Sequence, residues 1–313
     1  MTLNTSRCAF IFPGQGSQSL GMGQALASAF PIARETFAEA DHLLDFPLSR
    51  LAWEGPEQDL NDTVNTQPAL FVHSIAALRV FLDIYPGFGP AFIAGHSMGE
   101  LSALVAAQAL SFEDGLHLVR IRGESMKQAG EISPGGMAAI IGLDITAVEH
   151  ICQEASDASE VVQVANDNCP GQVVISGASP ALQRAMTLSE QAGARKVVPL
   201  AVSIAAHSPL MVHAQDRFNQ AVNRTPISNP QIPIIGNVSA APLISAEEIR
   251  TDLQAQLNSR VRWTESIQSI SKQGVTTYLE IGSGAVLSGL VKRIDRQAQA
   301  IQLGLPEDFT KLS

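Results

Sequence analysis

"AGHSMGELSAL", residues 94–104, carries a serine between two glycines, directly after the apolar run at 92–94. The pattern G-x-S-x-G between a strand and a helix is typical of a nucleophile elbow, a tight turn that leaves the serine exposed. The glycines permit the turn and close packing of the strand against the helix. We therefore predict that Ser97 is a nucleophile and that the main-chain N–H of Met98, at the start of the helix, stabilises an oxyanion. The alternative is a chance match.

Other buried strands are predicted at 8–14 ("CAFIFPG"), 232–239 and 276–284 ("TTYLEIGSG"). A helical pattern of apolar residues at 67–85 lies between the first of these strands and the serine turn. Strands that lead into helices through glycine turns predict an α/β core with a parallel sheet. The turn after the first strand does not match a dinucleotide-binding motif, and we predict instead that it supplies a second oxyanion N–H, from Gln15.

Residues 131–202 follow a different pattern. Strands are predicted at 135–143, 161–166, 172–178 and 195–202, and helices at 144–156 and 179–193. This order, β-α-β-β-α-β, is typical of a ferredoxin-like unit. We therefore predict an α/β core formed by residues 1–130 and 203–313, with a ferredoxin-like subdomain inserted at 131–202.

The composition argues against several classes of protein. The net charge of −10 and the pI of about 5.1 make a broad nucleic-acid-binding surface unfavourable. The odd number and wide spacing of the three cysteines argue against a disulfide framework and against paired zinc ligands, which fits a reducing cytoplasm. The N-terminal apolar run is too short for a secretion signal, and we expect no segment long enough to cross a membrane. The predicted location is the cytoplasm.

A nucleophilic serine needs a base, and the chain has seven histidines. Four of them lie within helical patterns, which indicates surface or core positions. His96 adjoins the serine, on a turn where neighbouring side chains point apart. His207 follows a predicted strand and precedes Ser208-Pro209, so it lies in a loop of the kind that forms sites in α/β proteins. From the residues alone, His207 is either the base or a structural loop histidine.

Arg122 stands out within its helical pattern. On a helical wheel of residues 112–128, most charged side chains fall on one side, yet Arg122 lies in the middle of the apolar side. A buried arginine without a partner is costly. It therefore pairs with an internal Asp or Glu, or it binds an anionic ligand, and its planar fork suits a carboxylate.

Together these stretches resemble one family, the malonyl-coenzyme A:acyl carrier protein transacylases of fatty acid synthesis, which are kin to polyketide acyltransferase domains. The matching residues are "FPGQGSQ" (12–18), "TQPAL" (66–70), "AGHSMGE" (94–100), "RIRGE" (120–124), "SPGGMAAIIGL" (133–143), "NDNCPGQVVISG" (166–177), "AAHSPLM" (205–211), "GNVS" (236–239), "VRW" (261–263) and "EIGSGAVLSGLVKRI" (280–294). They cover nearly the whole chain in order. The family fold is an α/β-hydrolase-like core with a ferredoxin-like insertion, in agreement with the pattern above.

The resemblance implies a ping-pong acyltransferase with malonyl-CoA and phosphopantetheinylated acyl carrier protein as substrates, and with no metal or redox cofactor. Ser97 is then the acylated nucleophile and His207 its base. The N–H groups of Gln15 and Met98 are the implied oxyanion donors. In the family, the second nitrogen of the histidine commonly meets a main-chain carbonyl, which the resemblance places at Arg262.

The resemblance also assigns residues around the acyl group. Arg122 is similar to the arginine that binds the malonyl carboxylate. His96, Asn166 and Asn168 are expected to border the cleft. Ala206 stands where relatives often carry a serine or a larger residue, so the exclusion of α-substituted malonyl groups depends on this position.

Acyl carrier proteins of this type are acidic, so an enzyme with a net charge of −10 needs a local basic patch to bind them. Lys292 and Arg293 match a segment at the mouth of the cleft in the family and are the predicted docking site. Arg195-Lys196 is a second candidate, and a solvated helix face is the alternative reading of such charges. We expect the chain to act as a monomer.

Two other functions fit parts of the pattern. One is an acyl hydrolase of the same fold, which Arg122 disfavours because a non-acidic acyl group would leave its charge unpaired. The other is a non-catalytic module that binds carrier protein, which the intact Ser97 and His207 disfavour.

Overall fold

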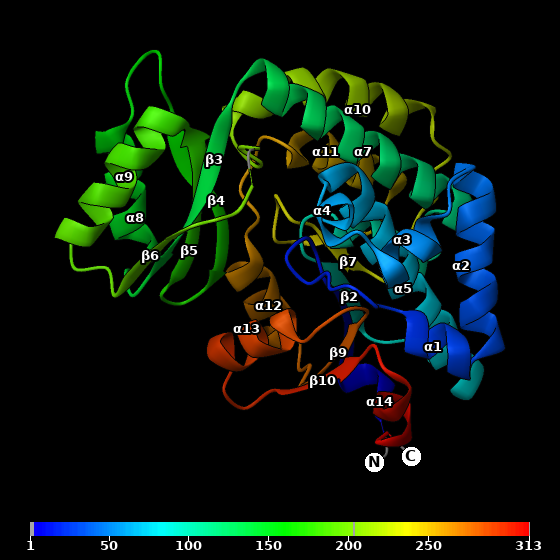
Figure 1. The fold of residues 1–313 in the computed structure, drawn as a ribbon. Helices are drawn as coiled ribbons and strands as arrows, with labels where there is room; N and C mark the ends of the chain where they lie inside the picture. Colours follow the sequence, from blue (N-terminus) through cyan, green and yellow to red (C-terminus); the bar gives the residue numbers. More distant parts are fainter. Residues whose placement is uncertain (1–2, 203, 313) are drawn as a thin grey trace.

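The chain forms two separate β-sheets (Figure 1). The structure is a computed structural model that describes residues 3–202 and 204–312. The larger sheet has six strands in the order β10-β9-β1-β2-β7-β8, and the smaller has four in the order β4-β5-β3-β6. The predicted mixed α/β class is therefore confirmed.

The larger sheet is parallel except at one edge. Its strands are β1 (Cys8–Phe12), β2 (Phe92–Gly95), β7 (Ile234–Ile235), β8 (Pro242–Leu243), β9 (Thr277–Ile281) and β10 (Gln299–Leu303). Only β8 runs antiparallel to its neighbour, β7. The turns that follow β1, β2, β7 and β9 therefore meet at one edge, where open α/β sheets bind their ligands.

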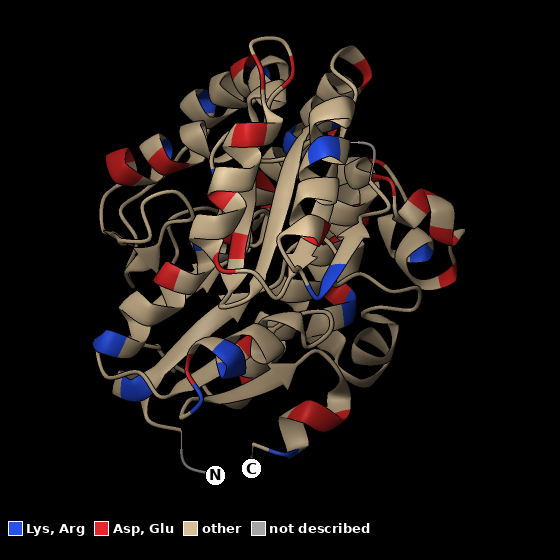
Figure 2. Ribbon diagram, turned by 90° about the vertical axis from the view of Figure 1, so that its left-hand side faces the viewer, with Lys and Arg blue, Asp and Glu red and all other residues tan. Residues whose placement is uncertain are grey.

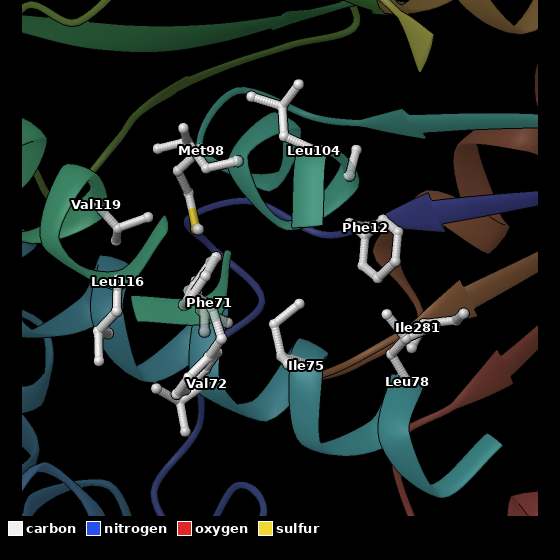
Figure 3. Packing of buried hydrophobic residues seen from close by; sticks show 14 of the residues in the cluster. Phe12, Phe71, Val72, Ile75, Leu78, Met98, Leu104, Leu116, Val119 and Ile281 are labelled. Carbon is white, nitrogen blue, oxygen red and sulfur yellow. The ribbon is translucent and has the colours of Figure 1, made fainter. Parts of the chain in front are cut away.

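Helices cover both faces of this sheet. On one face lie α5 (Thr63–Ile84) and α6 (Gly99–Ala106), with α7 (Phe112–Ile132) packed against them, and on the other lie α12 (Trp263–Lys272) and α13 (Val286–Ile294). The side chains of β1 divide by alternation, because Phe10 and Phe12 join the first group while Ala9 and Ile11 join the second. Figure 3 shows Phe71, Ile75 and Leu78 of α5 on the side of the core that faces Phe12.

The remaining helices surround this three-layer core. They are η1 (Thr5–Arg7), α1 (Gln24–Ala29), α2 (Pro31–Leu44), α3 (Leu48–Glu54), α4 (Glu57–Leu60), η2 (Pro209–Met211), α10 (Val212–Arg224), α11 (Ala246–Gln256) and α14 (Pro306–Thr310). The two ends of the chain lie close to one another beside α14 (Figure 1).

The helix α5 corrects one expectation from the sequence. Within residues 3–202 and 204–312, this helix of 22 residues, with a mean hydropathy of 1.3, is long and apolar enough to cross a membrane by length and composition. The expectation that no segment reaches that length was therefore wrong. The hydropathy refers to a window of 18 residues within the helix, and 78% of that window is buried inside the protein. The helix α5 is therefore a core helix in this fold.

The smaller sheet follows the predicted β-α-β-β-α-β order. Its elements are β3 (Gly135–Ile141), α8 (Ile145–Ala155), β4 (Val162–Cys169), β5 (Gln172–Ala178), α9 (Ser179–Gln191) and β6 (Lys196–Pro199). Every neighbouring pair of strands is antiparallel. The side chain of Asp144 caps α8 by accepting from the N–H of Ala147 at 2.9 Å. The edge strand β4 packs against α12 and α13, which joins this sheet to the larger body.

Several strands differ in length from the predicted ones, and two of these differences bear on the site. The strand predicted at 232–239 is only Ile234–Ile235, because the chain turns at Gly236, whose carbonyl accepts from the N–H of Ala240 at 3.1 Å. The strand predicted at 161–166 continues to Cys169. Both differences bring polar side chains, described next, toward the serine turn.

Candidate active site

The turn after β2 has the strand–turn–helix context predicted for a nucleophile elbow. Ser97 is held in the left-handed backbone region, with φ 51°. A Cβ on Gly95 would lie 2.0 Å from the main chain of Gly99, and one on Gly99 would lie 2.3 Å from the carbonyl oxygen of Phe12. Only glycine fits these two positions, since strand, turn and helix approach so closely. The N–H of Ser97 donates to Oδ1 of Asn237 at 2.7 Å, which fixes the turn to the end of β7.

His207 contacts the predicted nucleophile directly. Its Nε2 lies 2.7 Å from Oγ of Ser97. Its Nδ1 lies 2.9 Å from the carbonyl oxygen of Gln256 and 3.1 Å from that of Ser259. Because a carbonyl can only accept, Nδ1 carries the proton and Nε2 is left free to accept the proton of the serine hydroxyl.

The carbonyl that orients His207 is not that of Arg262, so this prediction was wrong. Arg262 is the N-cap of α12, and its carbonyl accepts from the N–H of Ser266 at 2.9 Å instead. Its N–H donates to the carbonyl of Asn237 at 3.0 Å, and its guanidinium pairs with Glu265. Arg262 therefore supports the turn that holds Asn237 and does not contact the imidazole.

The surroundings of His207 keep it in the form that a base requires. Burial, and secondly the charge of Arg122, lower the pKa of His207 to about 3. The two main-chain carbonyls act in the opposite direction but more weakly. The imidazole is therefore neutral at physiological pH and able to take a proton.

Arg122 lies on the buried side of α7, as the helical wheel predicts, with 1% of its surface exposed. The helix α7 approaches α5 closely, because a Cβ on Gly123 would lie 2.8 Å from the carbonyl oxygen of Thr63. This approach brings Gln67 of α5 to the guanidinium, with Nη1 2.7 Å from Oε1. Another guanidinium nitrogen, Nη2, donates to Oγ of Ser97 at 3.0 Å.

The hydrogen-bond partners of Arg122 are neutral. Besides Ser97 and Gln67 they are Oε1 of Gln256 at 3.1 Å and Sδ of Met126 at 3.3 Å. Burial lowers the pKa of Arg122 to about 10, partly offset by the nearby Glu100 carboxyl, so the guanidinium remains charged at neutral pH. The sequence left two explanations for Arg122, an internal ion pair or an anionic ligand. Among the described residues, Arg122 forms no direct ion pair with an Asp or Glu. The guanidinium is available to an anionic ligand.

Of the two predicted oxyanion donors, Met98 belongs to the serine turn and Gln15 lies on a loop beside it. A Cβ on Gly14 would lie 2.5 Å from the carbonyl oxygen of His96, so the loop that carries Gln15 runs directly against the serine turn. The side chain of Gln15 accepts from the hydroxyl of Thr63 at 3.0 Å, while the side chain of Met98 is buried in the core. Within residues 3–202 and 204–312, no hydrogen bond engages the main-chain N–H of either residue.

Side chains of the smaller sheet contact the serine turn and the base from β4. Oδ1 of Asn168 lies 2.8 Å from Nε2 of His96, and Gln163 donates to the carbonyl of His207 at 2.8 Å. Asn166 and Asn168 are both buried, at 6% and 9% exposure. Ala206, directly before the base, is half-buried against the main core.

The two residues predicted to dock a carrier protein are exposed at the end of α13. Arg293 reaches to the turn between β4 and β5, where it donates to Oε1 of Gln172 and to the carbonyl of Pro170. Lys292 beside it is exposed. Acidic and basic residues are interspersed over the helices and loops (Figure 2). The docking role of Lys292 and Arg293 stays a prediction.

Several polar residues of the site carried no predicted role. They are Gln67, Glu100, Asn237 and Gln256, all buried at 2% exposure or less. Gln67 and Glu100 are polar positions inside otherwise apolar helical patterns, the same signal that singled out Arg122. Asn237 and Gln256 have no such signal. In the part of the chain that the structure describes, no group of three or more His, Cys, Asp or Glu side chains could hold a metal ion.

With this geometry established, comparison with known proteins identifies the family. The chain matches the family model of the acyl transferase domain over residues 9–303. It is also 45% identical over 302 residues to the malonyl CoA-acyl carrier protein transacylase of Bacillus subtilis, which covers 96% of this chain and 95% of the relative. The chain belongs to the malonyl CoA-acyl carrier protein transacylase family. The resemblance noted in the sequence is thus confirmed.

Solved structures of this transacylase family have the same fold. The malonyl-CoA:acyl carrier protein transacylase of Xanthomonas oryzae is 44% identical, with a TM-score of 0.94 that covers 99% of this chain and 98% of that one. A malonyl-transacylase solved in complex with a type II PKS acyl-carrier protein is 42% identical, with a TM-score of 0.93, and covers 97% of this chain and 98% of its own. The present transacylase is therefore an acyltransferase enzyme, with its fold preserved over nearly the full chain.

Proposed function

We propose that this enzyme transfers the malonyl group of malonyl-CoA to the phosphopantetheine thiol of acyl carrier protein, through an ester on Ser97. The observation that carries the proposal is the convergence of Nε2 of His207 and Nη2 of Arg122 on Oγ of Ser97, at 2.7 and 3.0 Å. One methylene separates the carboxylate of a malonyl group from its thioester carbonyl. A cation beside the nucleophile can therefore bind the carboxylate while the serine attacks the carbonyl.

In the first half-reaction the hydroxyl of Ser97 gives its proton to Nε2 of His207 as Oγ attacks the thioester carbonyl. The N–H groups of Gln15 and Met98 stabilise the oxyanion that forms. The carbon–sulfur bond then breaks, the imidazolium returns its proton to the sulfur, and coenzyme A leaves. The main-chain carbonyls of Gln256 and Ser259 hold the imidazole in the tautomer that this exchange needs.

The second half-reaction uses the same groups in reverse order. His207 takes the proton of the phosphopantetheine thiol, whose sulfur attacks the acyl carbonyl of the ester on Ser97. The bond to Oγ breaks, and the hydroxyl regains a proton from the imidazolium. A thioester is exchanged for a thioester, so the reaction needs no external energy source, and we infer that no metal or redox cofactor takes part.

The setting of this activity is part of the proposal. We infer that the larger sheet with its serine elbow is α/β-hydrolase-like, formed by residues 1–130 and 203–313, and that residues 131–202 are a ferredoxin-like subdomain. All three cysteines are buried and unpaired, which supports a cytoplasmic location. We further infer that the enzyme acts as a monomer in fatty acid synthesis, with acyl carrier protein docked at Lys292 and Arg293, and that it binds neither nucleic acid nor a membrane.

Intact mass measurement tests the proposed function. The enzyme is mixed briefly with malonyl-, methylmalonyl- or acetyl-CoA, and then with holo acyl carrier protein. We expect a malonyl adduct that moves to the carrier protein, and little acetyl adduct. Rapid release of free malonate in the absence of carrier protein would identify a hydrolase, and the absence of any adduct would show a non-catalytic protein.

A further inference from the structure

A buried group of polar side chains lies behind the serine turn. It consists of Glu100 of α6, Asn237 after β7, and Asp252 and Gln256 of α11, and we refer to it as the polar cluster. Their exposures are 1%, 2%, 5% and 0%. Polar groups buried this deeply are costly unless each is hydrogen-bonded, so the arrangement of these bonds is strongly constrained.

Gln256 is the member of the cluster that contacts the three catalytic groups. Its Nε2 donates to the carbonyl of Ser97 at 3.2 Å, and its Oε1 accepts from Nε of Arg122 at 3.1 Å. Its main-chain carbonyl accepts from Nδ1 of His207 at 2.9 Å. If the side-chain amide were turned over, it would present N–H groups to the guanidinium, and two donors would face one another.

Glu100 decides which way this amide points. Its Oε2 accepts from Nε2 of Gln256, which leaves Oε1 of Gln256 directed at Arg122. Its Oε1 accepts from the N–H of Asn237 at 3.2 Å, and Asn237 in turn holds the N–H of Ser97. The carboxyl of Glu100 therefore orients the side-chain amide of Gln256 and holds the main chain at Asn237, whose own side-chain amide is oriented by its donation to the carbonyl of Gly95 at 2.8 Å.

A second carboxyl adjoins Glu100 in the cluster. Asp252 accepts from the N–H groups of Val238 and Ser239, at 3.2 and 3.1 Å, and its side chain contacts that of Glu100. Each of two adjoining buried carboxyls disfavours the ionised form of the other. Burial, and then the charge of Asp252, hold the pKa of Glu100 well above its usual range. The other charged group that faces Glu100 is Arg122.

We propose that Glu100 is a positioning residue that locks the amide of Gln256 against Arg122, so that the guanidinium is held beside Ser97 where it can bind an acidic acyl group. The inference rests on the proposed malonyl transfer and adds a determinant of its specificity. The carboxyl of Glu100 bonds the amide of Gln256 and not the guanidinium itself, so the planar fork of Arg122 is left for the substrate carboxylate.

Two substitutions separate the hydrogen bond from the charge. Glu100→Gln removes any charge, keeps nearly the same shape and keeps one acceptor oxygen for Nε2 of Gln256, while its NH2 group cannot accept the second, longer bond from the N–H of Asn237. Because the bond to Gln256 is kept, we expect the KM for malonyl-CoA to stay within about threefold of the native value. Glu100→Leu keeps the volume but removes both acceptors. The amide of Gln256 is then free to turn, and we expect the KM for malonyl-CoA to rise about tenfold or more, with little change in acetyl loading.

Glu280 offers a matched control for the loss of a buried acid. It is 0% exposed and caps α13, accepting from the N–H groups of Leu287 and Ser288 at 2.9 and 2.6 Å, with no part in the polar cluster. Glu280→Gln should lower the melting temperature without changing the ratio of malonyl to acetyl loading. A purely structural role of Glu100 predicts the same behaviour for Glu100→Leu.

The test measures acyl-enzyme formation by intact mass over a range of malonyl- and acetyl-CoA concentrations, together with thermal unfolding of each variant. Folded Glu100→Leu that keeps the native malonyl preference would overturn the inference. If that variant does not fold, Glu100→Gln decides, since a tenfold rise in its malonyl KM would show that an acceptor for the amide of Gln256 is not sufficient and would overturn the inference. No malonyl adduct on the native enzyme would overturn the proposed function and the inference with it, whereas the other outcomes leave the proposed function intact.

Discussion

The two sheets contribute unequally to the site, and their topology explains the difference. In the larger sheet the parallel strands β1, β2 and β7 end at one edge. Their direction alone therefore brings the following loops, with Gln15, Ser97 and Asn237, together there. In the smaller sheet the strands alternate in direction, and the edge strand β4 lies against α12 and α13 of the larger body. It contributes Asn168 and Gln163, which contact His96 and the main chain of His207 but not the serine oxygen.

The largest effect should follow from removing the nucleophile of the larger sheet. Ser97→Ala should abolish the covalent malonyl adduct, because the hydroxyl that forms the ester is gone, while the fold is retained. Intact mass after mixing with malonyl-CoA measures the adduct, and circular dichroism checks the fold. A folded variant that still gains the malonyl mass would remove Ser97 from the mechanism.

Removing the cation should have the next largest effect. A hydrogen bond to a charged group contributes about 1.5–3 kcal/mol, or roughly ten- to a hundredfold in kcat/KM. Arg122→Ala should reduce malonyl transfer by that factor and also end the preference for malonyl over acetyl groups. Arg122→Lys should restore activity only in part, since an ammonium keeps the charge but not the two-pronged geometry.

The measurement for Arg122 is the ratio of malonyl to acetyl adduct under matched conditions. Equal losses for both acyl groups, together with a lower melting temperature, would indicate a structural arginine instead.

A smaller effect is expected where the two sheets meet at the surface. Reversing both charges of Lys292 and Arg293 to glutamate should raise the KM for acyl carrier protein about tenfold and leave the half-reaction with coenzyme A nearly unchanged. The same reversal at Arg195 and Lys196, the second candidate, which is exposed on the smaller sheet, should have a smaller effect, and a larger rise in KM there would move the docking site to these residues. Equal damage to both half-reactions would argue against docking.

Removing a side chain of the smaller sheet should have a still smaller effect, on the rate of malonyl loading. Asn168→Ala removes one neutral hydrogen bond to His96, which contributes about 0.5–1.5 kcal/mol, so malonyl loading should fall about two- to tenfold. Rapid-quench measurement of acyl-enzyme formation gives the rate. A loss as large as that of Arg122→Ala would mean that the smaller sheet takes a direct part in the chemistry.

The smallest expected change is one of pH. An unperturbed histidine, with a pKa near 6.5, would lose about 30-fold in base activity between pH 7.5 and pH 5. The pKa of His207 is lowered to about 3, so the imidazole stays neutral over that range. The rate of malonyl loading should therefore change less than about twofold. An acid limb centred near pH 6.5 in kcat/KM would contradict the burial of the base.

The sequence predicts best what depends on local pattern. The β-α-β-β-α-β order and the buried face of Arg122 follow from alternation and helical spacing, which packing then preserves. The carbonyl partner of His207 does not follow, because it depends on the path of the loop after α11 and not on any side chain. The partners of Gln67 and Gln256 cannot be predicted from the sequence either. A neutral amide gives no indication of which charged group it contacts until the helices are packed.

The backbone at both reacting residues has one further consequence. Ser97 and His207 each have a positive φ, 51° and 57°, in a region where side chains other than glycine cost about 1 kcal/mol or more. Glycine at either position would relieve the main chain and also remove a group that the reaction needs. The two reacting residues therefore cost folding free energy that the reaction requires, and substitutions selected for stability alone would favour glycine at both positions.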